Sequence, residues 1–316
     1  MSADKVIVVA GPTATGKTKL GILLAQRFSG EIVSADSMQV YRRMDIGTAK
    51  ATAEERAAVP HHMLDAAGPE ENYSVSRYVG EASRCCGDIL ARGKTPVIVG
   101  GTGLYIDSLV SGRDFAERSE GDEALRGELN ARYEALGGEA MLEELRAFDP
   151  DRAAKLHPSD KRRIVRAIEI YRLTGETISA HDRRTRELPP RYEALRIVLN
   201  YRDRVDLYAR IDARVDDMVA AGLFDEVAGL LQSGLSPEST AMQAIGYKEA
   251  ALSLAGAIGR EEAIAQIKQN SRRYAKRQVT WFSRWNDALF LRWDGTPDFE
   301  KACRLSTEFL IARGLS

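Results

Sequence analysis

The chain has 316 residues, of which 44% are hydrophobic and 29% charged, and its formal net charge is -1. This composition is typical of a folded globular protein and excludes a chain that is disordered throughout. The near-zero net charge gives no overall sign of a nucleic-acid partner, so such a partner has to be sought in local clusters of basic residues.

Cysteine usage and hydropathy predict a cytoplasmic protein. The cysteines Cys85, Cys86 and Cys303 have no spacing suited to a zinc site or to a disulfide framework. The chain begins without an apolar leader, and no stretch is long and apolar enough to cross a bilayer. We therefore expect no membrane partner.

Short β-branched runs alternate with helical patterns in the first part of the chain. Residues 5–10, 31–35 and 95–99 are predicted to be buried strands, and residues 17–28 and 76–92 are predicted to be amphipathic helices. Alternation of this kind predicts an α/β fold with a parallel sheet.

Residues 115–190 differ in character, because they are rich in charged and helix-forming residues and carry almost no strand signal. Beyond them a strand is predicted over 195–201, then mainly helices, and a last strand over 289–293. At this length we expect two domains or one domain that carries an insertion. The predicted parts are the first half of an α/β core at 1–114, a helical insertion at 115–190, and the remainder of the core at 191–316.

A glycine-rich motif joins the first strand to the first helix. Its sequence, GPTATGKT, matches the G-x-x-x-x-G-K-[ST] phosphate-binding loop in the strand-to-helix context that this loop requires. The glycines let amide N–H groups point at one anion, Lys17 adds a positive charge, and the Thr18 hydroxyl is placed to bind Mg²⁺. The loop alone leaves open whether it binds a nucleotide or another diphosphate. The residues expected to bind it are Gly11, Pro12, Thr13, Ala14, Thr15, Gly16, Lys17 and Thr18.

A carboxylate follows the second predicted strand. Asp36 would lie at the carboxyl edge of the sheet beside the phosphate loop, where open α/β sheets bind ligands. There it can ligate a metal or accept a proton from a nucleophile, and the alternative is an aspartate that caps the following segment. A second glycine-rich turn, after the strand at 95–99, brings the Thr102 hydroxyl to the same edge.

Two adjacent histidines, His61 and His62, raise the alternative of a metal site. No second group of ligands at a recognisable spacing accompanies them. We therefore expect hydrogen-bonded roles that anchor a loop.

The segment 271–285 combines basic and aromatic residues and contains no acidic residue. Basic groups bind phosphate, and aromatic rings stack on bases. We expect Trp281 and Trp285 to pack mainly in the core, which leaves the basic residues for RNA. These are Arg272, Arg273, Lys276 and Arg277.

Four segments together resemble the bacterial tRNA dimethylallyltransferase family. They are GPTATGKT at the phosphate loop, SADSMQVYRRMDIGTAK across the second strand, VGGTGLY at the later strand edge, and RRYAKRQVTWFSRW near the C-terminus. The resemblance implies a P-loop NTPase-like core with a helical insertion domain. It also implies transfer of a dimethylallyl group, with Mg²⁺, from dimethylallyl diphosphate to the N6 amine of the adenosine 3′-adjacent to the anticodon.

The resemblance further implies individual roles. Asp36 would be the general base, Thr18 would bind the metal and the diphosphate, and Arg214 would join Lys17 on the leaving group. Arg210, one helical turn earlier, is a secondary candidate. A monomer would bind one tRNA anticodon stem-loop. Besides the basic residues already named, the implied tRNA contacts are Asp36, Ser37, Met38, Gln39, Thr102, Lys161, Arg162, Arg163, Ile164, Val165, Gln243, Gly246, Tyr247 and Lys248.

Two other functions use the same phosphate loop. A small-molecule or nucleotide kinase would also need Mg²⁺ and a carboxylate at the second strand edge, but it leaves the basic aromatic segment unexplained. An RNA-binding NTPase would tolerate the basic clusters, yet no separate segment indicates a switch. Whether ATP also binds the loop stays open.

Overall fold

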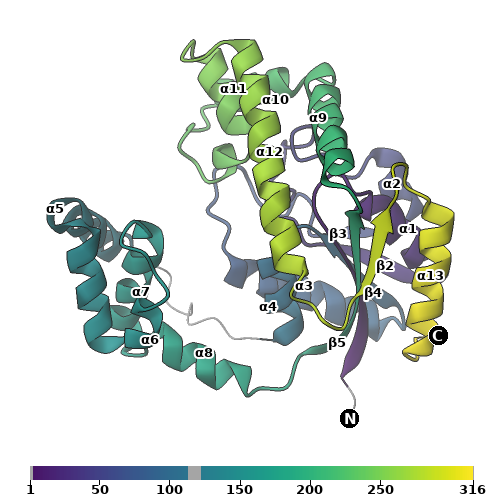
Figure 1. The fold of residues 1–316 in the computed structure, drawn as a ribbon, viewed down its shortest axis with the longest axis horizontal. Helices are drawn as coiled ribbons and strands as arrows, with labels where there is room; N and C mark the ends of the chain where they lie inside the picture. The colour runs from purple at the N-terminus through teal and green to yellow at the C-terminus, as the bar shows by residue number, and fades with distance from the viewer. Residues whose placement is uncertain (1–2, 113–121, 316) are drawn as a thin grey trace. The chain divides into compact units, whose positions relative to one another are not determined.

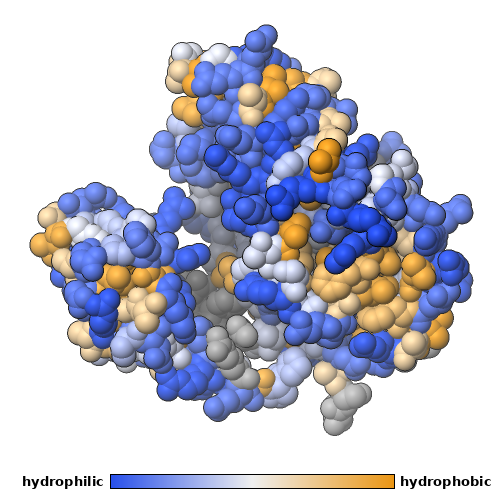
Figure 2. Space-filling model, viewed as in Figure 1, coloured by the Kyte–Doolittle hydropathy of each residue, from blue (hydrophilic) through white to orange (hydrophobic). Residues whose placement is uncertain are grey.

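The computed structural model describes residues 3–112 and 122–315. The chain divides into two compact units, of which unit 1 comprises Met1–Val110 with Arg191–Ser316 and unit 2 comprises Ser111–Pro190. The predicted boundary between residues 114 and 115 lies outside the described residues. Among the described residues, no helix has both the length and the apolar character that crossing a membrane requires. Hydrophilic residues cover much of the face shown in Figure 2.

Unit 1 is built on one parallel sheet (Figure 1), which confirms the predicted α/β class. The strands lie in the order β3-β2-β4-β1-β5-β6, and every pairing is parallel. Val6 to Ala10 of the central strand are fully buried, as a strand covered on both faces requires. The two-residue strand β3 was not predicted. The strands are β1 (Asp4–Ala10), β2 (Gly30–Ser34), β3 (His61–His62), β4 (Thr95–Gly100), β5 (Tyr192–Tyr201) and β6 (Leu289–Trp293).

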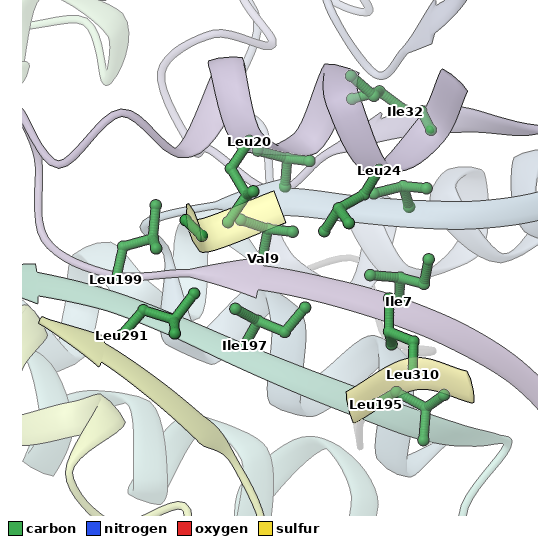
Figure 3. Close-up of a cluster of buried hydrophobic side chains, with 14 of the residues drawn as sticks. Ile7, Val9, Leu20, Leu24, Ile32, Leu195, Ile197, Leu199, Leu291 and Leu310 are labelled. Atoms are coloured by element: carbon green, nitrogen blue, oxygen red, sulfur yellow. The ribbon is translucent and has the colours of Figure 1, made fainter. Parts of the chain in front are cut away.

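Helices that follow the strands cover this sheet. Helix α1 (Lys17–Arg27) packs on β2, β4 and helix α13 (Phe299–Ala312), while α3 (Val75–Ala91) packs on β2 and β4. Leu20 and Leu24 of α1 enter the main hydrophobic core together with residues from β1 and β5 (Figure 3). Two further helices are α2 (Ala53–Ala58) and α4 (Gly103–Ser111).

The remaining helices of unit 1 lie between β5 and β6 in sequence. Helix α12 packs against α9 and α11, and α10 packs against α11 (Figure 1). Ile211 of α9 and Ala275 of α12 reach the core of the sheet. The elements are α9 (Arg204–Ala220), α10 (Leu223–Gln232), the 3₁₀ helix η1 (Ala241–Gln243), α11 (Tyr247–Leu254) and α12 (Arg260–Phe282).

Unit 2 is helical in its described part and has a core of its own. The long helix α5 is interrupted at Gly137, whose φ of +80° suits glycine. Leu129, Met141 and Ile168 are fully buried within this core. The helices are α5 (Glu123–Phe148), α6 (Pro150–Ala153), α7 (Lys161–Thr174) and α8 (Ile178–Arg186).

Candidate active site

The carboxyl ends of β1, β2 and β4 face one cavity within unit 1. Loops after these strands form one side of it, and α9 and α12 form the other. This is the edge at which open α/β sheets bind ligands. The polar residues that line it include Thr13, Lys17, Thr18, Asp36, Gln39, Arg214, Tyr274 and Gln278.

The phosphate loop is fixed by close packing at its two glycines. Gly11 has a φ of +147°, and a Cβ there would lie 2.2 Å from the Leu199 carbonyl oxygen. Gly16 has a φ of +81°, and a Cβ there would lie 2.4 Å from the ring of Phe299. Because only glycine avoids both the steric clash and the strained backbone, these two positions set the curl of the loop.

The inner part of the loop is held by hydrogen bonds. The Thr15 hydroxyl donates to the Pro12 carbonyl at 2.8 Å, and the Trp293 indole N–H donates to the Thr15 carbonyl at 3.0 Å. The C-terminal strand β6 therefore braces the loop, although it lies far away in sequence.

Two cations in the cavity are electrostatically destabilised. Burial, followed by the nearby charge of Arg214, lowers the pKa of Lys17 to about 7, while Asp36 acts in the opposite direction. Burial also lowers the pKa of Arg214, again against the charge of Asp36. The Lys17 amine donates to the Pro12 carbonyl at 2.8 Å, and the buried Nε of Arg214 has no hydrogen-bond partner among the described residues. An anion bound between these two groups would stabilise both charges.

Arg210, the secondary candidate for the diphosphate, is placed differently. Its side chain is exposed and adjoins the Tyr201 hydroxyl, and the residue does not belong to the cavity lining. The pair of cations that faces Asp36 is therefore Lys17 and Arg214.

Asp36 lies in the loop just after β2 and orders the backbone that follows. Its Oδ1 accepts hydrogen bonds from the Met38 N–H at 2.9 Å and the Gln39 N–H at 3.4 Å. The capping role considered from sequence is thus present, and it coexists with a place in the cavity lining. The Ser37 N–H donates to the Thr102 hydroxyl oxygen at 3.1 Å, so the loops after β2 and β4 are joined beside Asp36.

Gln39 holds the next segment of the cavity wall. Its Nε2 donates to the carbonyl oxygens of Thr48 and Ala49 at 3.1 and 3.3 Å, and its Oε1 accepts from the Ser34 hydroxyl at 3.2 Å. Met38 and Gln39 both line the cavity.

A carboxylate from α10 fixes the same wall from outside. Glu226 accepts hydrogen bonds from three consecutive amides, those of Asp45, Ile46 and Gly47, and from the Tyr247 hydroxyl. Tyr247 is therefore buried, and its ring is not exposed to a ligand. Gly246 lines the cavity, whereas Gln243 and Lys248 are exposed.

Helix α12 presents two faces. Arg273, Lys276 and Arg277 are exposed, as RNA contacts would need to be. Arg272, in contrast, pairs with Asp212 of α9 through Nη1–Oδ1 at 2.6 Å. Our interpretation of Arg272 as an open phosphate contact missed this partner.

Of the two tryptophans of this segment, Trp285 is buried as expected, whereas Trp281 is only partly buried. Their indole N–H groups donate to the Asp107 carboxylate of α4, at 2.8 Å from Trp281 and 3.0 Å from Trp285. Burial raises the pKa of Asp107 despite these two bonds. The tryptophans therefore attach α12 to α4.

Sequence reasoning missed Tyr274 and Gln278, which both line the cavity. Burial, then the charge of Asp36, raises the pKa of Tyr274 to about 12, while its hydrogen bond with Thr102 acts in the opposite direction. Gln278 is buried and bonded to the loops on both sides. Their spacing of one helical turn, on the face away from Lys276, was the signal that could have identified them.

The two histidines are anchored by neighbours. His62 Nε2 lies 2.7 Å from Glu31 Oε2, and His61 Nδ1 lies 2.7 Å from the Val59 carbonyl oxygen. His61 also lines the cavity. Within residues 3–112 and 122–315, no three His, Cys, Asp or Glu side chains are grouped as a metal site.

The predicted RNA-binding residues of unit 2 lie at the start of α7. Arg162 and Arg163 are exposed, and Lys161 pairs with Glu134 at 2.5 Å. Ile164 and Val165 are buried in the helical core, so their side chains do not face solvent.

The fold and the cavity define a P-loop enzyme in which a phosphate cradle with two cations lies beside a carboxylate. The chain matches the family model described as IPP transferase over residues 39–285, and the model described as isopentenyl transferase over residues 4–67. It therefore belongs to the IPP transferase family and is a transferase.

Named relatives agree with this assignment. The chain is 45% identical to a tRNA dimethylallyltransferase of Thermoanaerobacter sp. (strain X514) over 94% of both chains, and 49% identical to one of Carboxydothermus hydrogenoformans over 89% of this chain and 90% of that one. Among solved structures, the tRNA isopentenylpyrophosphate transferase of Bacillus halodurans aligns with a TM-score of 0.73 at 41% identity, covering 98% of this chain and 96% of that one. A eukaryotic dimethylallyltransferase described as acting on tRNA aligns with a TM-score of 0.82 at 32% identity, covering 99% of this chain and 81% of that one.

Proposed function

We propose that this protein transfers the dimethylallyl group of dimethylallyl diphosphate to the N6 amine of the adenosine 3′-adjacent to the anticodon in tRNA. The products are N6-isopentenyladenosine in tRNA and diphosphate. The observation that carries the proposal is the placement of Asp36 in one cavity with Lys17 and Arg214, in a chain whose relatives are tRNA dimethylallyltransferases.

The cations act on the leaving group. Breaking the allylic C–O bond puts negative charge on diphosphate, so groups that bind the product anion more tightly than the ester accelerate the reaction. Burial lowers the pKa of both Lys17 and Arg214, so a bound anion would stabilise the charged form of each. Loss of one preorganised donor of this kind typically costs about 3–4 kcal/mol of transition-state stabilisation.

Asp36 acts on the nucleophile. As the N6 nitrogen attacks the allylic carbon it becomes cationic, and a carboxylate within hydrogen-bond reach can remove the N–H proton. Thr102 and Tyr274 lie near Asp36, and their hydroxyl groups are available to the adenine. An adenine in an anticodon loop reaches such a buried carboxylate only if it is turned out of its stack.

The cavity also suits Mg²⁺. This ion prefers oxygen ligands and usually keeps waters and substrate phosphate oxygens, so one or two protein ligands suffice. The Thr18 hydroxyl, at the start of α1 and in the cavity lining, would hold it, as the resemblance implies. When bound, the ion would add positive charge at the diphosphate.

The exposed basic residues are proposed to bind the anticodon stem-loop. On α12 these are Arg273, Lys276 and Arg277, and on α7 they are Arg162 and Arg163. Their contacts with phosphate would make binding depend on salt. We expect a monomer that binds one tRNA, as the family resemblance implies.

A label-transfer assay tests the proposal against a kinase and against an RNA-binding NTPase. The protein is incubated with unmodified tRNA and dimethylallyl diphosphate that carries its label in the allyl group, and separately with tRNA and ATP. We expect label in the RNA without ATP. A requirement for ATP, or phosphate transfer from ATP with no label in the RNA, would overturn the proposal.

A further inference from the structure

Gln278 of α12 connects two loops that flank the cavity. Its Oε1 accepts a hydrogen bond from the Thr13 N–H at 2.9 Å, and its Nε2 donates to the Gly101 carbonyl oxygen at 2.9 Å. The residue is buried, with a relative exposure of 5%. Since one partner is a donor and the other an acceptor, only one orientation of the amide satisfies both.

One of the two loops would bind the diphosphate leaving group, and the other lies beside the proposed general base. Thr13 belongs to the phosphate loop, which would hold the diphosphate. Gly101 precedes Thr102, whose hydroxyl oxygen accepts the Ser37 N–H beside Asp36. The Gln278 amide is therefore the link between the leaving-group side and the general-base side.

The approach of this side chain depends on glycine at position 101. A Cβ on Gly101 would lie 2.3 Å from Gln278 Nε2, and the next atom met, the amide carbon, would lie at 3.5 Å. Glycine thus makes room for the amide to reach the backbone.

Helix α12 carries Gln278 on one side, and on its solvent-exposed side it carries the residues proposed to bind RNA. Gln278 and Tyr274 lie one turn apart on the cavity side, whereas Arg273, Lys276 and Arg277 are exposed. Trp281 near the end of α12 and Trp285 just after it both donate hydrogen bonds to Asp107, which joins this end of the helix to α4. A helix held in this way can fix both loops at once.

We propose that Gln278 is a positioning residue that holds the phosphate loop in register with the Asp36–Thr102 edge, so that the allylic carbon and the adenine amine meet in line. The inference rests on the proposed function, because it assigns the two loops to the two substrates. Transfer between bound groups is sensitive to such placement, and an error of about 1 Å can cost about 10²-fold in rate.

The first test replaces the amide by a chain of similar length without polar atoms. We expect Gln278→Met to lower kcat for label transfer by about 10²-fold, with a smaller change in the KM for tRNA. It should also weaken binding of inorganic diphosphate, measured by calorimetry, by about tenfold, because the phosphate loop loses its order in the free protein. The matched control is Gln266→Met on the same helix, where the side-chain amide donates to Glu262 at the surface.

The second test restores the hydrogen bond by protonation. In Gln278→Glu a carboxylate would face the Gly101 carbonyl, whereas the protonated acid can donate to it and still accept from Thr13. The pKa of a buried carboxyl in this position should be raised. We therefore expect turnover of Gln278→Glu, divided by that of the wild type, to rise as the pH falls from about 8 to about 6, while the same ratio for Gln278→Met stays flat.

A side chain needed only for folding would lower the melting temperature and leave the kcat of the folded fraction and the pH ratio unchanged. Unchanged kcat in Gln278→Met, or unchanged affinity for inorganic diphosphate, would overturn the inference. If the wild type transferred no label, the proposed function would fail, and the diphosphate titration would still decide whether Gln278 orders the phosphate loop.

Discussion

At the scale of single residues, the site depends on charges that the fold holds close together. Asp36 lies two residues after the end of β2 and is followed by amides that it binds itself, so its position is set locally. Lys17 follows the second glycine of the phosphate loop, and this order could be predicted from the motif alone. Arg214 comes from a helix almost two hundred residues later, and only the resemblance to a family identified it.

Asp36 is expected to be essential for turnover and nearly dispensable for binding. In Asp36→Asn the amide oxygen can still accept the Met38 N–H, which preserves the loop, but the group no longer removes a proton. We expect kcat to fall by about 10²–10⁴-fold, with the tRNA dissociation constant within about threefold of the wild type. Single-turnover label transfer and filter binding measure the two quantities, and full turnover in this variant would exclude Asp36 as the base.

Lys17 is expected to take up a proton when the site binds an anion. With a pKa of about 7, the Lys17 amine is mostly neutral near pH 8 and mostly charged near pH 6. A bound diphosphate favours the charged form and raises this pKa, so binding near pH 8 should take up close to one proton. Near pH 6 the uptake should largely disappear.

Calorimetry in buffers of different ionisation enthalpy measures this proton uptake. Diphosphate itself titrates in the same range, so Lys17→Met serves as the reference and the difference between the two proteins isolates the lysine. An equal number of protons in both proteins would show that Lys17 is already charged before the anion binds.

At the scale of elements, hydrophobic periodicity predicted the long strands and helices, because each buries an apolar face large enough to mark the sequence. It missed β3, which has two residues, and α4, where buried glycine and serine interrupt the pattern. It also missed the inner face of α12. Periodicity indicates that Tyr274 and Gln278 share a side of a helix, but not that this side meets a phosphate loop more than 250 positions earlier.

The outer face of α12 should determine how RNA binding responds to salt. Lys276 is exposed, so we expect Lys276→Ala to reduce the slope of log K against log salt for an anticodon stem-loop by roughly one. The charge of Arg272 is already balanced by Asp212, so Arg272→Ala should change the slope by much less. Titrations at several salt concentrations measure both slopes. Equal reductions would mean that Arg272 leaves Asp212 in the complex.

At the scale of the whole molecule, the candidate active site belongs to unit 1, and the inserted helical unit 2 is a separate part of the chain. Composition alone predicted the insertion, because a charged helical stretch interrupts a strand-rich core. Every residue that lines the cavity belongs to unit 1. Unit 2 buries its own core, which includes Ile164 and Val165, and it contributes exposed arginines at the start of α7. Sequence could not distinguish buried from exposed positions there, because basic and apolar residues adjoin in one turn.

Removing unit 2 should leave diphosphate binding intact and weaken RNA binding. The ends of unit 1 at the insertion are adjacent, since the Arg191 N–H donates to the Val110 carbonyl at 3.0 Å, so a short Gly/Ser linker can replace residues 111–190 without strain. We expect the shortened protein to bind inorganic diphosphate within about threefold of the full chain, because every residue that lines the cavity, Lys17 and Arg214 included, belongs to unit 1. Affinity for the anticodon stem-loop should fall, and its salt slope should become shallower as the phosphate contacts proposed for Arg162 and Arg163 are lost.

Calorimetry and RNA titration measure the two affinities, with circular dichroism as the check on folding. A folded variant that binds RNA like the full chain would remove unit 2 from the proposed tRNA interface and leave α12 as its main basic surface.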